Sequence, residues 1–341
     1  MIRNKVVVFA TALIVSLGFL TSSSAQEVAD KPTVKETPKA LTELYNKSRE
    51  VLAEDLSDLK HPVKPMLWKV EGNGLQKASY LFGSIHVSAP NITTLHPDAE
   101  AAYQQADTLA TEVSFDPAEL NKIVKMLNRI DGKTLKQSIG DELFNELDSQ
   151  LKAVVPFISA EAFNESKTWA TILVHSMLEE QIKGKTALDQ VLWNRATKDN
   201  KQKWALERAE DQLGVFDELT EQEQIILLRD ALSSATRLKK EKINPLDLIK
   251  QLYLKRDKEN IVKLMFTTDE TEGIDIDFAT NEKFMDLLLR KRNIQIADKI
   301  HQTLTEAPGK SHFMVAGTLH YIGDHNIGKM LKNKGYIVTA Q

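Results

Sequence analysis

The stretch Leu81-Phe82-Gly83-Ser84-Ile85-His86 has a near copy, Val315-Ala316-Gly317-Thr318-Leu319-His320, close to the end of the chain. In each copy an apolar, β-prone run ends in Gly-x-x-His, and the two histidines are 234 positions apart (320 − 86). Ligands of open α/β sheets collect beyond the carboxyl ends of the strands, where a glycine lets backbone or ligand approach closely. The pair therefore predicts two strand ends that build one site. The alternative is two turn histidines that hydrogen-bond their own backbone.

Predicted strands and helices alternate at both ends of the chain. The expected strands are 66–71, 78–85, 108–113, 203–207, 312–316 and 336–340, with the hairpin signal Gly72-Asn73-Gly74 between the first two. The expected helices are 39–59, 97–106, 281–304 and 327–334, with further helix starts at Asp116-Pro117, Thr220-Glu221-Gln222-Glu223 and Asn244-Pro245. This order predicts an α/β fold over residues 66–341, with a mixed or mostly parallel central sheet and a large helical insertion at about 117–305.

The first 25 residues have the pattern of a signal peptide. Arg3 and Lys5 precede an apolar run at 6–20, and Ser23-x-Ala25 is a small-x-small cleavage site. The run is shorter than the roughly 20 residues that span a bilayer, although a retained membrane anchor is the alternative. We expect cleavage before Gln26, a linker and short helix at 26–65, and a mature protein that is periplasmic or secreted and has no stable membrane span.

Composition narrows the classes of protein and of site. Of 341 residues, 42% are hydrophobic and 27% charged, as in ordinary globular proteins. Without residues 1–25 the formal charge is (44 − 2) − 48 = −6, which argues against a nucleic-acid partner. The chain has no cysteine, so disulfides, thiolate zinc sites and cysteine nucleophiles are excluded, and any metal must be bound by histidines and carboxylates. No serine-hydrolase elbow, P-loop or dinucleotide fingerprint follows a predicted strand.

Two glutamates occupy places that match those of the histidines. Glu112 follows the run Thr108-Leu109-Ala110-Thr111, and Glu207 ends Trp204-Ala205-Leu206. Glutamate is unfavourable in strands, and buried acids persist when they are paired, hydrogen-bonded or metal-bound. His86, His320, Glu112 and Glu207 therefore form a candidate divalent-metal site, with donors that suit Zn, Mn, Fe or Co. For either glutamate alone, a solvated strand end is the alternative.

Arg292 interrupts an apolar row on the helix expected at 281–304. Steps of four residues along that helix give Leu288, Arg292, Ile296 and Ile300. An arginine in such a row either extends outward to water or meets a carboxylate. Two glutamates, two neutral histidines and a divalent cation sum to zero, so Arg292 would leave the site at +1. That surplus suits a substrate carboxylate or a developing oxyanion. The remaining histidines are expected to be structural or exposed.

Together these motifs resemble the TraB/GumN family, which is related to the Tiki proteases. The matching stretches are Leu67-Trp68-Lys69-Val70, residues 80–87, Ala106-Asp107-Thr108-Leu109 with Glu112, Leu188-Asp189, Leu206-Glu207 with Glu210 and Gln212, Arg292-Asn293 with Ala297 and Ile300, and residues 313–320 with Gly323, Gly328, Leu331 and Gly335-Tyr336. They cover about residues 66–341 in the family's order. The departures are mild: Ser84 stands where threonine is usual, and Thr318-Leu319 where smaller residues are usual.

The resemblance implies a function and roles for five residues. The Tiki branch binds a divalent metal such as Mn or Co through paired Gly-x-x-His motifs and acids, and cleaves peptides near their N-termini. Carried over, His86 and His320 match the motif histidines, while Glu112, Glu207 and Arg292 match recurring charged positions. We therefore expect an exported hydrolase that depends on Mn, Co or Zn and acts on a peptide or small-molecule substrate. One glutamate would be a general base, and Arg292 would hold that glutamate or an oxyanion. The alternative is a non-catalytic periplasmic protein that binds or sequesters a peptide or small ligand.

Overall fold

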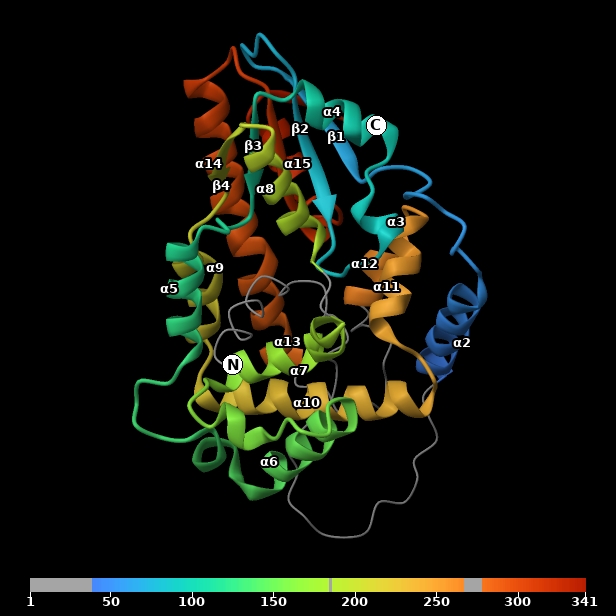
Figure 1. The fold of residues 1–341 in the computed structure, drawn as a ribbon, viewed down its shortest axis with the longest axis vertical. Coiled ribbons are helices and arrows are strands. Elements are labelled where there is room, and N and C mark those ends of the chain that lie inside the picture. Colours follow the sequence, from blue (N-terminus) through green and yellow to red (C-terminus); the bar gives the residue numbers. More distant parts are fainter. Residues whose placement is uncertain (1–38, 184–185, 267–277) are drawn as a thin grey trace.

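A sheet and a group of helices make up the structure, a computed structural model that describes residues 39–183, 186–266 and 278–341 (Figure 1). The strands are β1 Leu67–Gly72, β2 Ser79–Ser84, β3 Thr108–Thr111, β4 Gln202–Ala205, β5 His312–Gly317 and β6 Tyr336–Ala340. The helices are α2 Lys39–Ala53, α3 Pro90–Thr93, α4 Pro97–Gln105, α5 Pro117–Leu127, α6 Leu135–Val154, α7 Thr168–Ile182, α8 Leu188–Lys198, α9 Ala209–Gly214, α10 Glu221–Lys240, α11 Pro245–Leu254, α12 Lys258–Phe266, α13 Phe278–Met285, α14 Arg292–Glu306 and α15 Ile327–Asn333.

The described strands form one sheet in the order β4-β3-β5-β2-β1-β6. β4, β3, β5 and β2 are parallel, whereas β1 is antiparallel to both of its neighbours. In the β1–β2 hairpin, Gly72, Asn73 and Gly74 have φ of +78°, +48° and +82°, a backbone that glycine and asparagine tolerate. The prediction of a mixed, mostly parallel sheet is confirmed. Because β2 and β5 are parallel neighbours, the two Gly-x-x-His motifs lie side by side.

Helices cover the two faces of the sheet. On one face, Leu81 and Met314 pack with Ile296 and Ile300 of α14. On the other face the rings of Phe82 and Phe313 stack with centroids 5.2 Å apart. Every central position of β5 is buried, as expected for a parallel strand covered on both sides. The carboxyl ends of the parallel strands point toward the helical part of the molecule (Figure 1).

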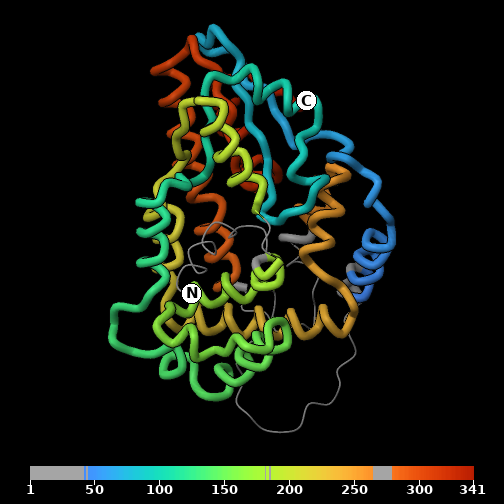
Figure 2. Tube along the Cα trace, in the orientation of Figure 1, coloured from blue at the N-terminus to red at the C-terminus, as the bar shows by residue number. Residues whose placement is uncertain are grey.

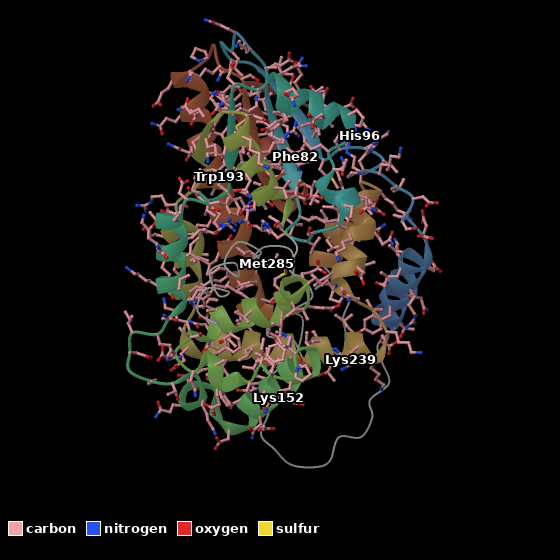
Figure 3. The ribbon with its side chains drawn as sticks, viewed as in Figure 1. Phe82, His96, Lys152, Trp193, Lys239 and Met285 are labelled. Carbon is pink, nitrogen blue, oxygen red and sulfur yellow. The ribbon has the colours of Figure 1, made fainter. Side chains whose placement is uncertain are left out.

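The predicted helical insertion is divided by β4. Helices α5 to α8 lie between β3 and β4, and α9 to α14 lie between β4 and β5. Capping boxes at Thr134 and Thr220 start α6 and α10, the second as the sequence predicts. Figure 3 shows Lys152 and Lys239 in this helical part, well away from Phe82 and Trp193 in the part that contains the sheet. The tube in Figure 2 follows α14 from the helices up along the sheet.

Two helices differ from their predicted extents. α2 ends at Ala53 instead of residue 59, because Asp55 accepts the Ser57 N–H in a local turn that competes with the helix (N···O 2.9 Å). The helix expected at 281–304 exists as α13 and α14, joined by a π-helical segment, Asp286–Lys291. The predicted signal peptide lies outside the described residues. In the ranges that the structure describes, no helix is long and apolar enough to cross a membrane.

Candidate functional site

Four predicted site residues follow the carboxyl ends of four parallel strands. His86 comes two residues after β2, Glu112 directly after β3, and Glu207 two residues after β4. His320 ends the 3₁₀ turn Thr318–His320 that follows β5. All four side chains are buried. The sheet therefore brings together residues up to 234 positions apart, as the strand-end argument predicts.

Glu112 lies at the centre of this group. Its Oε1 accepts the Gly317 N–H, and its Oε2 accepts a hydrogen bond from Gln212 Nε2 (3.0 Å). The Nε2 atoms of His86 and His320 lie 3.9 and 3.8 Å from the nearer carboxylate oxygen. Burial raises the pKa of Glu112, but the neighbouring His320, Arg292 and His86 outweigh burial and lower that pKa to about 2. Glu112 is therefore an ionised carboxylate shared by two imidazoles.

Arg292 binds both glutamates and is fully buried, with 0% exposure. Its Nη2 donates to Glu112 Oε2 (2.9 Å), and its Nε and Nη2 together engage Glu207, with 3.1 Å from Nε to Oε2. Nη1 donates to the carbonyl of Leu288 in the π-helical segment (3.1 Å). Of the two alternatives for this arginine, it meets carboxylates and does not extend to water.

The two glutamates have pKa values displaced in opposite directions. Burial raises the pKa of Glu207, and its contacts with Arg292 only partly oppose that rise. Burial also favours the neutral form of Arg292, yet Glu207 and Glu112 raise the pKa of the guanidinium, which stays charged. The two carboxylates thus share one cation, and Glu207 is the one that takes up a proton more readily.

His320 is held in one neutral tautomer. Its Nδ1 contacts Asn293 Oδ1, while Asn293 Nδ2 donates to the carbonyl of His325 (2.8 Å), which fixes the orientation of the amide. Nδ1 must therefore carry the proton, and Nε2 is left with a lone pair and no hydrogen-bond partner. Burial lowers the pKa of His320 to about 3. A lone pair that faces the Glu112 carboxylate at 3.8 Å suits a cation bound between the two groups.

His86 is oriented by a carboxylate that the sequence analysis did not assign to the site. Asp189, in the first turn of α8, accepts the Ser84 hydroxyl at Oδ1 (2.7 Å). Its Oδ2 is 3.4 Å from His86 Nδ1, within ion-pair distance but without hydrogen-bond geometry. Burial lowers the pKa of His86, but Asp189 and then Glu112 raise it above its usual value. Neither ring nitrogen of His86 has a hydrogen-bond partner in the structure.

These residues fit a divalent metal in donor chemistry and in charge. In the protonation state that metal binding requires, with neutral histidines and ionised acids, Glu112, Glu207, Asp189 and Arg292 sum to −3 + 1 = −2. An unbalanced buried charge of that size is costly, and a divalent cation cancels it. Metal-binding histidines typically have their second nitrogen beside a carboxylate or carbonyl, as His86 and His320 do. Among the described residues, no group of three or more histidine and acidic side chains has the spacing to hold a metal ion as it stands.

The spacing of the donors is compatible with a shared ion. Two atoms bound to one ion at about 2.0–2.2 Å can be no more than about 4.4 Å apart. The separations of 3.9 and 3.8 Å between the imidazole nitrogens and Glu112 are within that limit. Each imidazole, taken with one oxygen of Glu112, therefore meets the distance limit for sharing an ion.

The two motif glycines, Gly83 and Gly317, allow the strand ends and the site side chains to pack this closely. A Cβ on Gly317 would lie 3.2 Å from Glu112 Oε1 and 3.7 Å from the ring of each histidine. A Cβ on Gly83 would lie 2.9 Å from Thr318 Oγ1, and the Gly83 carbonyl accepts the Tyr253 hydroxyl (2.8 Å). The first glycine therefore lets β2 and the second motif pack together, whereas the second leaves room for the carboxylate.

Sequence reasoning missed three supporting residues. Asp189, Gln212 and Asn293 occur in the matching motifs, but no role was predicted for them. Asp189 lies on the buried face of α8 with Leu188 and Leu192, so an acid on an apolar helix face was the available signal. Including Asp189 also changes the expected charge: with a divalent cation the site sums to zero instead of +1.

Several known metalloproteases are similar to this chain in sequence. The chain is 23% identical over 310 residues to the metalloprotease TIKI2 of Danio rerio, covering 80% of this chain and 60% of that protein. It is 22% identical over 329 residues to TIKI1 of Xenopus tropicalis (85% and 64%) and 23% identical over 323 residues to human TIKI1 (83% and 63%). The chain thus spans about three fifths of the length of these relatives. No solved structure matches it significantly. The model of the TraB/PrgY/gumN family matches residues 66–340, from the residue before β1 to the end of β6, and the chain belongs to that family.

Proposed function

We propose that this protein is a divalent-metal-dependent peptidase in which His86 and His320 bind the metal. The observation that carries the proposal is the pair of unpartnered imidazole nitrogens that face Glu112 within a buried group of formal charge −2. The distant similarity to TIKI metalloproteases supports a metallohydrolase and suggests a peptide as the substrate.

Contacts with the histidines and with Arg292 divide the roles of the two glutamates. A bound Mn, Co or Zn ion would polarise the scissile carbonyl as a Lewis acid. Glu112, which lies within 4 Å of an unpartnered nitrogen on each imidazole, would serve as the carboxylate ligand. Glu207, whose pKa is raised by burial, would be the glutamate that takes up and releases a proton. Arg292 forms ion pairs with both carboxylates, which fixes their orientation and offsets the repulsion between them.

Metal content and cleavage of the same preparations test the proposal. We expect about one Mn, Co or Zn ion per purified chain and metal-dependent cleavage of a peptide library. Both should disappear in the double variant His86→Ala/His320→Ala. The control is His301→Ala on α14, where the imidazole contacts the Tyr336 hydroxyl and should leave both properties unchanged. Full metal content in the double variant, or cleavage that persists in a chelator, would contradict the proposal.

One observation favours the second candidate function, binding without turnover. The imidazoles of His86 and His320 belong to residues that are only 6% and 0% exposed, and Glu112 beside them is 3% exposed. Such a buried group leaves little surface for a peptide bond to contact. Stoichiometric metal with no cleavage of any peptide in the library would favour a binding protein.

Export is a further part of the proposal and rests on residues 1–25 alone. Protein recovered from the periplasm should begin at Gln26. An intact mass that includes residues 1–25 would contradict this proposal and leave the metal site unaffected.

A further inference from the structure

A cavity of about 500 Å³ lies beside the second Gly-x-x-His motif. Its floor is sheet: Trp68 of β1, Leu81 of β2 and Val338 of β6 line it. Trp68 is paired with Leu81 across the β1–β2 ladder, and opposed residues of an antiparallel pair share a face. The cavity therefore occupies the part of this face that lies between α15 and α12.

The residues that directly follow His320 in the sequence line the cavity. Tyr321, Ile322 and Gly323, the three residues after His320, form one wall. Consecutive Cα atoms are about 3.8 Å apart, so the wall begins one residue from the proposed metal ligand. The ring of Tyr321 packs against Trp68, with centroids 5.7 Å apart, and its hydroxyl donates to the Met314 carbonyl (3.1 Å). The aromatic ring of Tyr321, tied to β5, thus forms the part of the cavity wall that follows His320 in the chain.

The rim is strongly cationic. The lining residues include four lysines, Lys258, Lys263, Lys329 and Lys332, and one acid, Glu259, a formal charge of 4 − 1 = +3. The whole chain has a formal charge of −4, so this cluster of lysines is opposite in sign to the net charge of the protein. Lys263 is paired with Glu259 (2.7 Å), and Lys329 with the exposed Asp324 (3.0 Å). Within the described ranges neither Lys258 nor Lys332 has a salt-bridge partner.

We propose that this cavity binds a carboxylate of the substrate, as an acidic side chain or a free C-terminus, with neighbouring apolar atoms on Trp68 and Tyr321. Lysine ammonium groups attract such an anion, and a low-dielectric wall strengthens the attraction. Tyr321, which follows His320 in the chain, would then align the substrate with the proposed metal. The inference takes its substrate class from the proposed peptidase function and adds a preference for acidic peptides.

Direct binding tests the preference without any turnover. Dye-labelled hexapeptides with two central glutamates, and their glutamine counterparts, are prepared with free-acid and amidated C-termini. We expect the glutamate peptides to bind at least about tenfold more tightly at low salt and to lose most of that advantage in about 0.5 M salt. Equal binding of the two amidated peptides, with tighter binding of both free acids, would identify the C-terminus as the anion. Equal binding of all four peptides would overturn the inference.

Charge-matched variants locate the binding. Lys258→Glu/Lys332→Glu should weaken binding of the acidic peptide about tenfold or more, because it reverses two rim charges. The control Lys198→Glu/Lys299→Glu makes the same change in net charge on exposed lysines of α8 and α14 that do not line the cavity. Equal weakening by the two pairs would mean a diffuse charge effect and would also overturn the inference.

Two further measurements separate this inference from the peptidase proposal. Tryptophan fluorescence should change when the unlabelled acidic peptide binds, and Trp68→Phe should abolish that change. In His86→Ala/His320→Ala, peptide binding should persist although metal binding and cleavage are lost. If the acidic peptide binds but no preparation cleaves it, the peptidase proposal is contradicted and the inference stands. If an anionic oligonucleotide or vesicle binds and the peptide does not, the inference is contradicted and the peptidase proposal stands.

Discussion

At the scale of single residues, the site depends on how buried charges are paired. Arg292 is a fully buried cation between two buried carboxylates, and its donors are divided between Glu112 and Glu207. Burying any one of these charges alone is costly, and the pairing offsets that cost. Each member is therefore required for the stability of the others, whatever reaction the site performs.

Replacing Arg292 by alanine should lower the free energy of unfolding by about 3–5 kcal/mol, because it leaves two buried carboxylates without their cation. Arg292→Lys should rescue only part of this loss, since an ammonium lacks the planar fork that now contacts both glutamates. Urea unfolding of the variants measures the effect. Arg290→Ala, which removes an exposed pair with Asp286, is the control and should cost no more than about 0.5 kcal/mol. A stable Arg292→Ala protein with impaired cleavage would instead indicate a purely catalytic arginine.

Asp189 should act on metal affinity through His86. Asp189→Asn keeps the shape of the side chain but removes the negative charge 3.4 Å from His86 Nδ1, so metal binding should weaken about 10- to 100-fold. Titration of the metal-free protein with Mn²⁺, Co²⁺ or Zn²⁺ gives the dissociation constants. Asp298→Asn is the control, because that carboxylate forms an exposed pair with Lys334. Equal affinities of wild type and Asp189→Asn would exclude Asp189 from the metal site.

At the scale of secondary-structure elements, the parallel pair β2–β5 is what aligns the two motifs. Gly83 pairs with Ala316, and Ser84 with Gly317. The Thr318 hydroxyl donates to the Ser84 carbonyl (2.9 Å), which continues the contact beyond the last strand pair. The glycines allow the two strand ends to approach this closely.

Gly83→Ala should destabilise the protein by about 1–3 kcal/mol, the usual cost of overpacking. The new Cβ would be 2.9 Å from Thr318 Oγ1 and 3.1 Å from Met66 Cβ, so the second motif must shift. Thermal unfolding measures the loss. Gly214→Ala on α9 is the matched control: nothing lies within 4 Å of its Cβ and the residue is helical, so alanine should be neutral or stabilise by up to about 1 kcal/mol. Identical stability of the two variants would show that the strand ends have spare room.

At the scale of the whole molecule, the part that contains the sheet and the helical part place different titratable groups away from water. The site gathers charged groups at the strand ends, whereas α6, α7 and α10 surround a cavity of about 800 Å³ that includes His175. Burial lowers the pKa of His175 to about 4, and its Nε2 contacts Gln150 Oε1 (2.9 Å). This imidazole is therefore neutral in the folded protein and protonates more readily when the chain unfolds.

His175 makes the stability of the molecule sensitive to acid. Because its folded pKa lies below the unfolded value of about 6.5, its contribution is complete above that pH and is lost as the pH falls toward 4. The free energy of unfolding of wild type relative to His175→Gln should fall over this window, by at most about 1.4 kcal/mol per pH unit. Urea unfolding of both proteins at intervals between pH 8 and pH 4 measures the difference. A constant difference across the window would exclude His175 as the responsible group.

Much of the architecture could be predicted from sequence, because it depends on local patterns. The glycine-rich hairpin, the capping box at Thr220 and the apolar strand runs each specify their own backbone over a few residues. The strand-end rule also brought His86 and His320 together, since both follow parallel strands. Even Arg292 was visible as a charge in an apolar row.

Other features were decided only by the tertiary structure, because they depend on packing between distant segments. The order of the strands puts β3, β5 and β2 side by side, so that the Glu112 carboxylate lies within 4 Å of both imidazoles, and no local pattern encodes that order. The π-helical segment before α14 and the approach of Asp189 to His86 arise from helices packed against the strand ends. The buried charge of −2 is likewise a property of the assembled group, since a carboxylate in a sequence shows neither its burial nor its partners.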